Sequence, residues 1–285
     1  MRILITGATG FIGNHVVTEL VKSHGSGNEI VATSTSLEKA RKTSWYSDVE
    51  YMAHDIYDRT VDPYELFNKP DVLIHLAWSG FPNYTQASHF EHVLFEEYRF
   101  HKHMIASGLK RLVYAGGTYA EYGNHDGCMK EEALSDPTTP YSIAKDTLRK
   151  MLALLAQDAT GFSLCWCRLF NVYGEGQNKG TFLAQLISAI KNNEKSFNMS
   201  AGEQLRDFIP VVVAADRIAK LAAAAEAEGI YNICSGTPTS LRTLAETTIE
   251  RMNASIHLNL GHYPYNTHEP MAIWGDGTKY ADLQL

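Results

Sequence analysis

The sequence predicts an α/β fold built on a doubly wound parallel sheet, followed by a smaller C-terminal lobe. Three observations predict it. An apolar strand at residues 3–5 runs straight into a glycine-rich turn and a helix, strand-like and helix-like segments then alternate, and this alternation loosens beyond residue 173. Alternating β and α segments are typical of parallel sheets that carry helices on both faces.

The glycine-rich turn indicates that the first strand and the helix after it form a binding site. Residues 3–5 form the continuous apolar run of a strand buried on both faces, and Gly7, Gly10 and Gly13 follow at the spacing Gly-x-x-Gly-x-x-Gly. The first glycine allows a tight turn, the second admits a pyrophosphate close to the backbone, and the third lets the helix at 11–23 pack on the strand. We therefore predict a Rossmann-type dinucleotide site at the amino end of this helix. A strand-turn-helix with no ligand is the alternative.

Further strands follow in order at residues 29–33, 49–56, 72–77, 111–115 and 162–168, which makes six, with another at 230–234. We expect long helices at 91–108 and 141–157 and a further helix at 241–252. Ligands of such sheets bind at the carboxyl ends of the strands. The residues at these ends, namely Ala77, Trp78, Thr118 and those from Arg168 onward, should therefore line one crevice.

Composition and charge narrow the class of protein. The chain has 285 residues, 45% hydrophobic and 20% charged, and no apolar run approaches the ~20 residues that span a bilayer. A net charge of −7 disfavours a nucleic-acid binder. A strand that begins at residue 2 leaves no room for a signal peptide, so we expect a cytoplasmic protein. None of the four cysteines forms a Cys-x-x-Cys pair, and Cys165 and Cys167, which stand two apart in a predicted strand, fit small core residues better than a metal site.

The end of the second strand bears on the choice of cofactor. An NAD site places a carboxylate there for the ribose hydroxyls, whereas an NADP site avoids it and offers a cation. Residues 33–36 are Thr-Ser-Thr-Ser, the first carboxylate is Glu38, and Lys39, Arg41 and Lys42 follow. NADP is therefore the predicted cofactor, with NAD possible. The three cations could instead form the solvated face of a helix.

A tyrosine and a lysine provide a candidate acid. Tyr141 and Lys145 open the helix after Pro140, and a spacing of four places them on one helix face. An ammonium near the phenol should lower the pKa of Tyr141 from about 10, so that it exchanges a proton with a bound oxygen near neutral pH. Thr118, at the end of the fifth strand, could hydrogen-bond the same oxygen.

Together these motifs resemble the extended short-chain dehydrogenase/reductase family, in its nucleotide-sugar branch. The resemblance covers nearly the whole chain and is specific because the motifs occur in one order. They are Gly7 to Gly13, Thr118-Tyr-Ala-Glu-Tyr-Gly123, Tyr141-x-x-x-Lys145, Arg168-Leu-Phe-Asn-Val-Tyr-Gly174 and Arg206-Asp-Phe208. The stretches 75–80 and 197–207 extend the resemblance. Within the family, it is strongest to reductases of dTDP-4-keto-6-deoxyhexoses, such as those that form dTDP-fucose or dTDP-6-deoxytalose.

The resemblance implies roles for individual residues. It implies that Thr118, Tyr141 and Lys145 are catalytic, with Tyr141 and Lys145 also at the nicotinamide ribose. It implies cofactor contacts from Gly7, Thr9, Gly10, Phe11, Ile12, Gly13, Ser34, Lys39, Asp55, Ile56, Leu76 and Ala77. It implies substrate contacts from Trp78, Thr118, Tyr119, Asn171 and Arg206, the last two at the diphosphate; a local salt bridge of Arg206 with Asp207 is the alternative. Residues 1–173 would form the NAD(P)-binding domain and residues 174–285 mainly a substrate-binding lobe, with about 207–234 returning to the first.

Departures from the family pattern narrow the set of reactions expected of this chain. A 4,6-dehydratase carries Asp-Glu after the catalytic threonine, where this chain has Tyr119 and Ala120, and an epimerase-reductase uses a nearby cysteine that is missing here until Cys128. We therefore expect an NADP-dependent 4-ketoreductase that acts on a nucleotide-linked 4-keto-6-deoxy sugar. An NAD-dependent 4-epimerase and a non-catalytic NADP-binding regulatory protein remain alternatives. The nucleotide base, the C4 configuration and the direction stay open.

Two further expectations concern metals and assembly. No metal site is predicted, and His75, His101 and His103 are expected to be structural. The helix at 141–157 carries Leu148, Met151, Leu152 and Leu155 at helical spacing, which is more apolar surface than one sheet face needs. The family resemblance implies a homodimer in which this helix and the helix at 91–108 form a four-helix bundle. Burial within one chain is the alternative.

Overall fold

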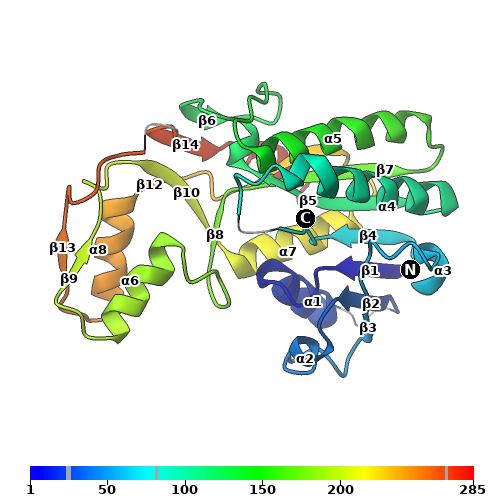
Figure 1. The fold of residues 1–285 in the computed structure, drawn as a ribbon, viewed down its shortest axis with the longest axis horizontal. Coiled ribbons are helices and arrows are strands. Elements are labelled where there is room, and N and C mark those ends of the chain that lie inside the picture. Colours follow the sequence, from blue (N-terminus) through cyan, green and yellow to red (C-terminus); the bar gives the residue numbers. More distant parts are fainter. Residues whose placement is uncertain (24–26, 81–82, 267–268) are drawn as a thin grey trace.

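A seven-stranded parallel sheet forms the centre of the molecule (Figure 1). The computed structural model describes residues 1–23, 27–80, 83–266 and 269–285, apart from the side chains of residues 117–119. The strand order is β11-β7-β5-β4-β1-β2-β3, and every neighbouring pair is parallel. The strands are β1 (Arg2–Thr6), β2 (Glu29–Ser34), β3 (Glu50–Ala53), β4 (Val72–His75), β5 (Arg111–Thr118), β7 (Ser163–Leu169) and β11 (Gly229–Ile233).

The predicted fold class is confirmed. The six strands expected up to residue 168 all lie in this sheet, and the seventh, β11, corresponds to the segment predicted at 230–234. The reversal of order at β1 creates the crevice between β1 and β4 at which open α/β sheets bind ligands. Residues from Ala77 and Trp78 onward follow β4 directly and therefore lie at this edge.

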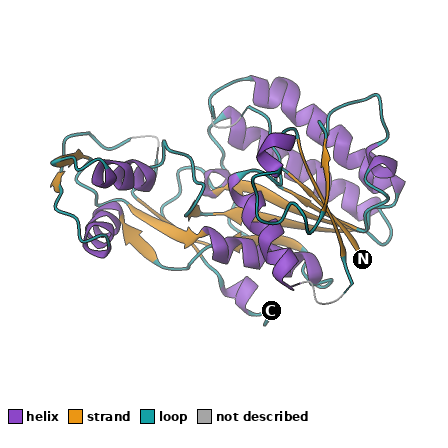
Figure 2. Ribbon diagram, turned by 90° about the horizontal axis from the view of Figure 1, so that it is seen from below, coloured by secondary structure: helices purple, strands orange, loops and turns teal. Residues whose placement is uncertain are grey.

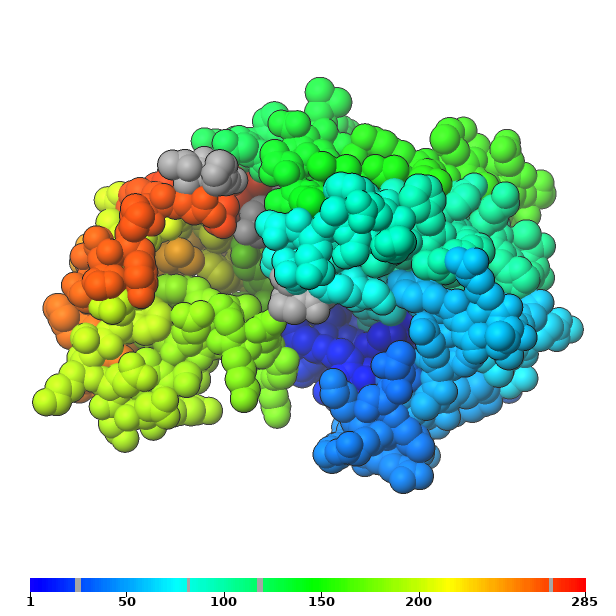
Figure 3. Space-filling view, viewed as in Figure 1, coloured from blue at the N-terminus to red at the C-terminus, as the bar shows by residue number. Residues whose placement is uncertain are grey.

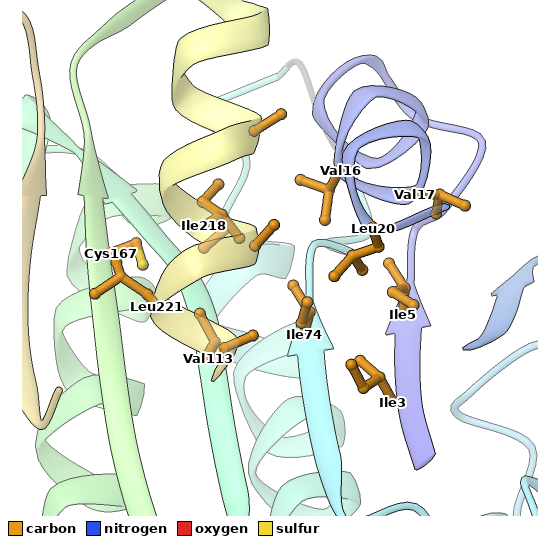
Figure 4. Packing of buried hydrophobic residues seen from close by; sticks show 14 of the residues in the cluster. Ile3, Ile5, Val16, Val17, Leu20, Ile74, Val113, Cys167, Ile218 and Leu221 are labelled. Atoms are coloured by element: carbon orange, nitrogen blue, oxygen red, sulfur yellow. The ribbon is translucent and has the colours of Figure 1, made fainter. Parts of the chain in front are cut away.

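Helices cover both faces of the sheet because its strands are apolar on both sides. In β1, Ile3 and Ile5 belong to one core and Leu4 to the other. The first core is covered by α1 (Phe11–Ser23) and α7 (Val211–Ala223), and Figure 4 shows Leu20 of α1 and Ile218 of α7 over the strands. The second core is covered by α4 (Leu94–Ser107) and α5 (Pro140–Asp158).

One long helix differs from prediction at its start, and the other begins where predicted. The helix expected at 91–108 begins as a π-helical turn, His89–Val93, and continues as α4. Helix α5 begins where predicted because its start is capped reciprocally: the Thr139 hydroxyl accepts from the Ser142 amide at 3.2 Å, and the Ser142 hydroxyl accepts from the Thr139 amide at 3.1 Å. Pro140 occupies the first turn, so Tyr141 is held at a fixed helix start.

The C-terminal lobe is built on a second sheet (Figure 2). Its strands run in the order β12-β10-β14-β6, with β8 paired to β10, and a two-stranded sheet β13-β9 lies apart from it. The strands are β6 (Gly127–Met129), β8 (Asn171–Tyr173), β9 (Ser196–Asn198), β10 (Leu205–Pro210), β12 (Pro238–Ser240), β13 (His257–Asn259) and β14 (Ala272–Gly275). The lobe's helices are α6 (Phe182–Lys191) and α8 (Leu241–Arg251), and the short helical elements of the chain are α2 (Leu37–Ala40), α3 (Pro63–Leu66), a 3-10 turn (Tyr119–Glu121) and α9 (Thr278–Ala281).

Most of this second half was expected only as short helices and turns. Helices α6 and α7 and the three-residue strands were not predicted individually, whereas α8 was expected at 241–252 and begins at Leu241. Helix α7 packs on the first sheet, and β11 pairs with β7 within it. The chain therefore crosses between the two parts more than once. The exact domain boundary at residues 173 and 174 stays a prediction.

Among the helices of the described residues, we find none with the length and hydrophobicity needed to cross a lipid bilayer.

Candidate active site

The glycine turn at the end of β1 depends on the absence of side chains at its glycines. Gly7 has φ +66°, and a Cβ there would lie 2.8 Å from the amide of Ala77. A Cβ on Gly13 would collide with the carbonyl of Gly7, so this glycine permits α1 to pack on the turn. A Cβ on Gly10 would meet only the Gly7 carbonyl, at 3.1 Å, and would otherwise fill open space. The turn therefore leaves a cradle beside the free amides of α1, whose first turn has no acidic residue.

The residues predicted to bind the cofactor surround this turn. Phe11 and Ile12 open α1, and the backbone of Leu76 and Ala77 lies against Gly7. The Thr9 hydroxyl donates to Ser34 Oγ at 2.9 Å, which links the turn to the end of β2. Ile56 is buried beyond β3, and the exposed Asp55 accepts from the amide of Tyr57 at 3.0 Å.

A cavity of about 520 Å³ opens beside the turn. Thr9, Gly10 and Phe11 line it together with Lys39 and Lys42. Of the three cations predicted to favour NADP, the structure thus brings two to this cavity, and Arg41 does not line it. Lys42 is paired with Glu38 at 2.5 Å, and both side chains are exposed.

The structure corrects the expected pairing of Tyr141 and Lys145. Both residues are buried on one face of α5, but Lys145 Nζ lies 5.8 Å from the Tyr141 ring centroid and donates to the hydroxyl of Tyr114 at 3.2 Å. The same ammonium lies 4.1 Å from the ring centroid of Trp78, in a cation–π contact. Tyr141 is packed edge-on against Trp78, Tyr84 and His89.

The expected lowering of the Tyr141 pKa was therefore wrong. Burial raises the pKa of Tyr141 well above its ordinary value, and the charges of Tyr84, Glu121 and Glu97 add to the rise. Burial also lowers the pKa of Lys145 to about 8, although Glu97 and Glu121 oppose this shift. The physical reason is that an aromatic, water-poor site disfavours charge on either group. Tyr141 is consequently a neutral hydroxyl, which can donate a proton.

Two predicted site residues fall outside the described side chains. Thr118 ends β5, where its backbone is paired with Leu169 after an irregularity in the β5–β7 register. Tyr119 begins the 3-10 turn that follows. The side chains of both residues lie outside the described part of the structure, so their predicted roles stay predictions.

The described residues predicted to bind substrate come from separate elements of the fold. Trp78 follows β4, and its indole Nε1 donates to Nδ1 of His89 at 3.1 Å. Asn171 and Arg206 lie on the paired strands β8 and β10. In the space-filling view the surface is hollowed between the yellow-green and orange C-terminal lobe and the cyan and blue sheet domain (Figure 3).

The surroundings of Arg206 differ from one expectation. The alternative of a local Arg206–Asp207 salt bridge was wrong, because Arg206 pairs with Glu269 at 3.1 Å. The Asp207 carboxylate instead accepts from the amides of Ser235 and Gly236, at 2.6 and 2.9 Å. The side chain of Asn171 donates to the carbonyl of Asp207 at 3.0 Å, which ties β8 to β10.

Sequence reasoning missed a buried polar cluster behind Lys145. The carboxylate of Glu97 accepts from the hydroxyls of Tyr57 and Tyr114, at 2.5 and 3.0 Å, and lies 3.0 Å from Nε2 of His75. His101 Nδ1 lies 3.6 Å from the same carboxylate. A signal was available in the sequence: Glu97 and His101 stand on the apolar stripe of α4, between positions that carry buried side chains such as Phe100 and Met104.

The histidines predicted to be structural have protein partners. A hydrogen bond of 2.9 Å links His75 Nδ1 to the Thr6 hydroxyl, and one of 2.7 Å links His101 Nδ1 to the Glu97 carbonyl. His103 lies apart from them and contacts the carboxylate of Asp62 at 2.9 Å. His75, Glu97 and His101 have the composition of a metal site, and the Nδ1 bonds of the two histidines to protein oxygens leave Nε2 of each ring able to act as a ligand. The positive charge of Lys145, which acts on Glu97, opposes a cation there, and the absence of a metal stays a prediction.

Comparisons with known proteins agree with this geometry. The model of the NAD dependent epimerase/dehydratase family matches residues 3–234. The chain is 31% identical over 279 residues to dTDP-6-deoxy-L-talose 4-dehydrogenase (NAD(+)) of Aggregatibacter actinomycetemcomitans, covering 96% of this chain and 99% of that protein. It is 26% identical to dTDP-4-dehydro-6-deoxyglucose reductase of Escherichia coli, covering 88% and 82%. The structure of MoeE5 in complex with UDP-glucuronic acid and NAD superimposes with a TM-score of 0.82 and 25% identity, over 99% of this chain and 92% of that one.

Proposed function

We propose, on the premise that the chain belongs to the NAD dependent epimerase/dehydratase family, that it is a nucleotide-sugar 4-ketoreductase. Its substrate is a dTDP-linked 4-keto-6-deoxyhexose, and its product is the corresponding C4 alcohol. The observation that carries this proposal is the neutral hydroxyl of Tyr141, buried beside the ammonium of Lys145 at the crevice. The relative with 31% identity is by its name a 4-dehydrogenase, and oxidation at C4 is the same reaction in reverse.

The roles of the residues follow from the charges that reduction of a ketone creates. A reduced nicotinamide cofactor supplies the hydride. As C4 accepts the hydride, negative charge develops on its oxygen, and Tyr141 donates the proton that converts this oxygen to a hydroxyl. Lys145 places a positive charge close by, which stabilises the phenolate left on Tyr141. Thr118 is proposed to orient the C4 oxygen, and Trp78 to line the sugar pocket.

For the cofactor we favour NADP, with NAD also accepted. Ser34 ends β2 with a neutral hydroxyl that is already bonded to Thr9 and to Tyr51, at 2.9 and 2.8 Å. No carboxylate stands there to accept both ribose hydroxyls, and Lys39 and Lys42 face the cavity in which a 2′-phosphate could lie. The name of the A. actinomycetemcomitans relative specifies NAD(+), which makes cofactor preference a decisive measurement.

Asn171 and Arg206 are proposed to hold the substrate diphosphate. A planar guanidinium can donate to two phosphate oxygens at once. The present partner of Arg206, Glu269, is half exposed, whereas the guanidinium itself is buried. A diphosphate could take the place of this carboxylate as the anion beside a guanidinium that is already buried. Tyr119 is proposed to contact the sugar.

We further propose a homodimer through α4 and α5, which lie side by side on one face of the sheet (Figure 1). Leu148 and Leu152, two of the residues predicted to be surplus to one sheet face, are in fact fully buried within the single chain. Exposed apolar side chains nevertheless remain on these helices, namely Phe95, Ile143 and Leu154. Such side chains are the kind that a bundle with a second copy would cover.

The test is a turnover screen with reduced cofactor. We expect oxidation of NADPH, followed by its absorbance, with a dTDP-linked 4-keto-6-deoxy sugar, and NMR of the product should show a C4 hydroxyl. A 4-epimerase is the second candidate, since the matching family model is named for epimerases. It would interconvert UDP-glucose and UDP-galactose without added reduced cofactor. Cofactor binding with no turnover of any nucleotide sugar would indicate a regulatory protein.

A further inference from the structure

A fully buried carboxylate lies behind the catalytic lysine. Glu97 projects from α4 and has 0% exposure, so it can touch neither substrate nor cofactor from solvent. Its oxygens receive the hydroxyls of Tyr57 and Tyr114 and lie 3.0 Å from the ring of His75. Placing a carboxylate in a core is costly unless its charge is used or compensated. The buried charge of Glu97 therefore has to be compensated by hydrogen-bond donors and by nearby positive charge.

Tyr114 connects this carboxylate to the catalytic lysine. Lys145 Nζ donates to the Tyr114 hydroxyl at 3.2 Å, and that hydroxyl donates to Glu97 Oε2 at 3.0 Å. The ring of Tyr114 is stacked on Trp166, with centroids 4.3 Å apart and planes at 12°. The hydroxyl cannot drift from this position without breaking the stack. Two hydrogen bonds in series therefore hold the ammonium at a defined place.

Other charged groups near Lys145 are committed elsewhere. Glu121, the second carboxylate that acts on Lys145, is paired with the guanidinium of Arg168 at 2.8 Å. Burial and the charge of His75 lower the pKa of His101 to about 3, so His101 adds no cation to the cluster. Among the residues whose side chains the structure describes, the aromatic rings of Trp78, Tyr114 and Tyr141 also face Lys145.

The charge state of Glu97 fits a role as counter-ion. Burial alone would raise its pKa, but His75, through its charge and its hydrogen bond, outweighs burial together with the charge of Lys145, and the pKa falls to about 2. Glu97 is therefore ionised throughout the neutral range. Its negative charge opposes the effect of burial on the ammonium of Lys145.

We propose that Glu97 is a positioning residue of the active site, which keeps Lys145 in place and protonated through the hydroxyl of Tyr114. This inference deepens the proposed function and rests on it only where turnover is measured. Tyr57, which follows the predicted cofactor contacts Asp55 and Ile56, belongs to the same cluster and donates to the other oxygen of Glu97.

The test compares Glu97→Gln with a matched change on the same helix. Glu97→Gln removes the charge with little change in volume. Glu96→Gln is the control, since Glu96 pairs with Arg59 and Arg99 at the surface. The first readout is the titration of the Lys145 ammonium by NMR of protein with ¹⁵N-labelled lysine, assigned with Lys145→Met. We expect its midpoint to fall by about one pH unit or more in Glu97→Gln and to stay unchanged in Glu96→Gln.

Turnover supplies the second readout. The alkaline limb of the kcat/KM profile should move to lower pH by the same amount in Glu97→Gln, with KM for the sugar unchanged. Tyr114→Phe keeps the charge of Glu97 but removes the bridge, so kcat should fall with a smaller shift of the midpoint. An unchanged Lys145 midpoint in a folded Glu97→Gln protein overturns the inference. If wild type turns over no nucleotide sugar, the proposed function fails, but the NMR titration still decides the role of Glu97.

Discussion

The ammonium of Lys145 donates a hydrogen bond of 3.2 Å to the hydroxyl of Tyr114 on β5. Its partner is therefore not Tyr141, the tyrosine one helical turn before it on α5. The two residues of the Tyr-x-x-x-Lys motif share a helix face, yet their polar atoms have different partners. Tyr141 is thus a neutral acid packed among aromatic rings, and Lys145 is a cation hydrogen-bonded to Tyr114.

Replacement of Tyr141 by phenylalanine should abolish most turnover without loss of cofactor binding. A positioned general acid contributes ~10²–10⁴-fold to rate, so kcat should fall by about that factor. Steady-state kinetics and fluorescence titration with NADPH measure the two effects. Tyr98→Phe on α4, where Lys102 lies over the ring, is the control. Wild-type kcat in Tyr141→Phe would remove this residue from the mechanism.

The rate of ketone reduction should decrease as the pH rises through about 8. Burial lowers the pKa of Lys145 to about 8, so the ammonium is present below that pH and is lost above it. Loss of its charge removes the stabilisation of the Tyr141 phenolate that forms as the proton leaves. A kcat/KM profile between pH 6 and 10 tests this, with Lys145→Met expected to lack the alkaline limb. A wild-type profile that stays flat across this range would contradict the assignment.

Alanine at both Lys39 and Lys42 should weaken NADPH binding and leave NADH binding unchanged. A charge-assisted hydrogen bond contributes roughly 1.5–3 kcal/mol, which corresponds to about a ten- to hundredfold change in affinity. Arg41→Ala is the matched control, since Arg41 is the neighbouring cation that does not line the cavity. The preference for NADP is wrong if NADH is used as well as NADPH, or if the double variant keeps its cofactor ratio.

Alanine at two glycines of the turn should separate folding from cofactor binding. A Cβ on Gly13 collides with the Gly7 carbonyl, so Gly13→Ala should lower the stability by about 1–3 kcal/mol. A Cβ on Gly10 meets only the Gly7 carbonyl at 3.1 Å, so Gly10→Ala should keep its Tm and lose cofactor affinity. Thermal unfolding with and without NADPH distinguishes the two. Normal NADPH binding by Gly10→Ala would contradict the proposed pyrophosphate site.

Glutamate at Leu154 should convert a dimer to a monomer. Leu154 is 63% exposed on α5, and a charge placed there would be desolvated in a bundle with a second copy. Light scattering at micromolar concentration gives the mass of wild type and variant. Leu134→Glu, at a position that is 83% exposed and outside the helices, should leave the mass unchanged. A monomeric wild type would end the dimer proposal.

Much of the fold could be predicted because it depends on short-range patterns. The run at residues 3–5 and the spacing of Gly7, Gly10 and Gly13 predict β1, the turn and α1, and the alternation of segments predicts the parallel sheet. The strands of the C-terminal lobe escaped prediction because most have three residues, too few to show a period. The π-helical turn His89–Val93 is likewise a local departure without a sequence period of its own.

The sequence by itself determined the nucleotide turn, the sheet and the helix that carries Tyr141 and Lys145. Only the tertiary structure decided what those two side chains face. The partners of Lys145 come from β5, α4 and the segment after β4, which are separated along the chain but adjacent in the fold. Proton affinity depends on burial and on charges within a few ångströms. These are properties of the assembled core, so no spacing along α5 could show that Tyr141 stays neutral while Glu97 faces Lys145.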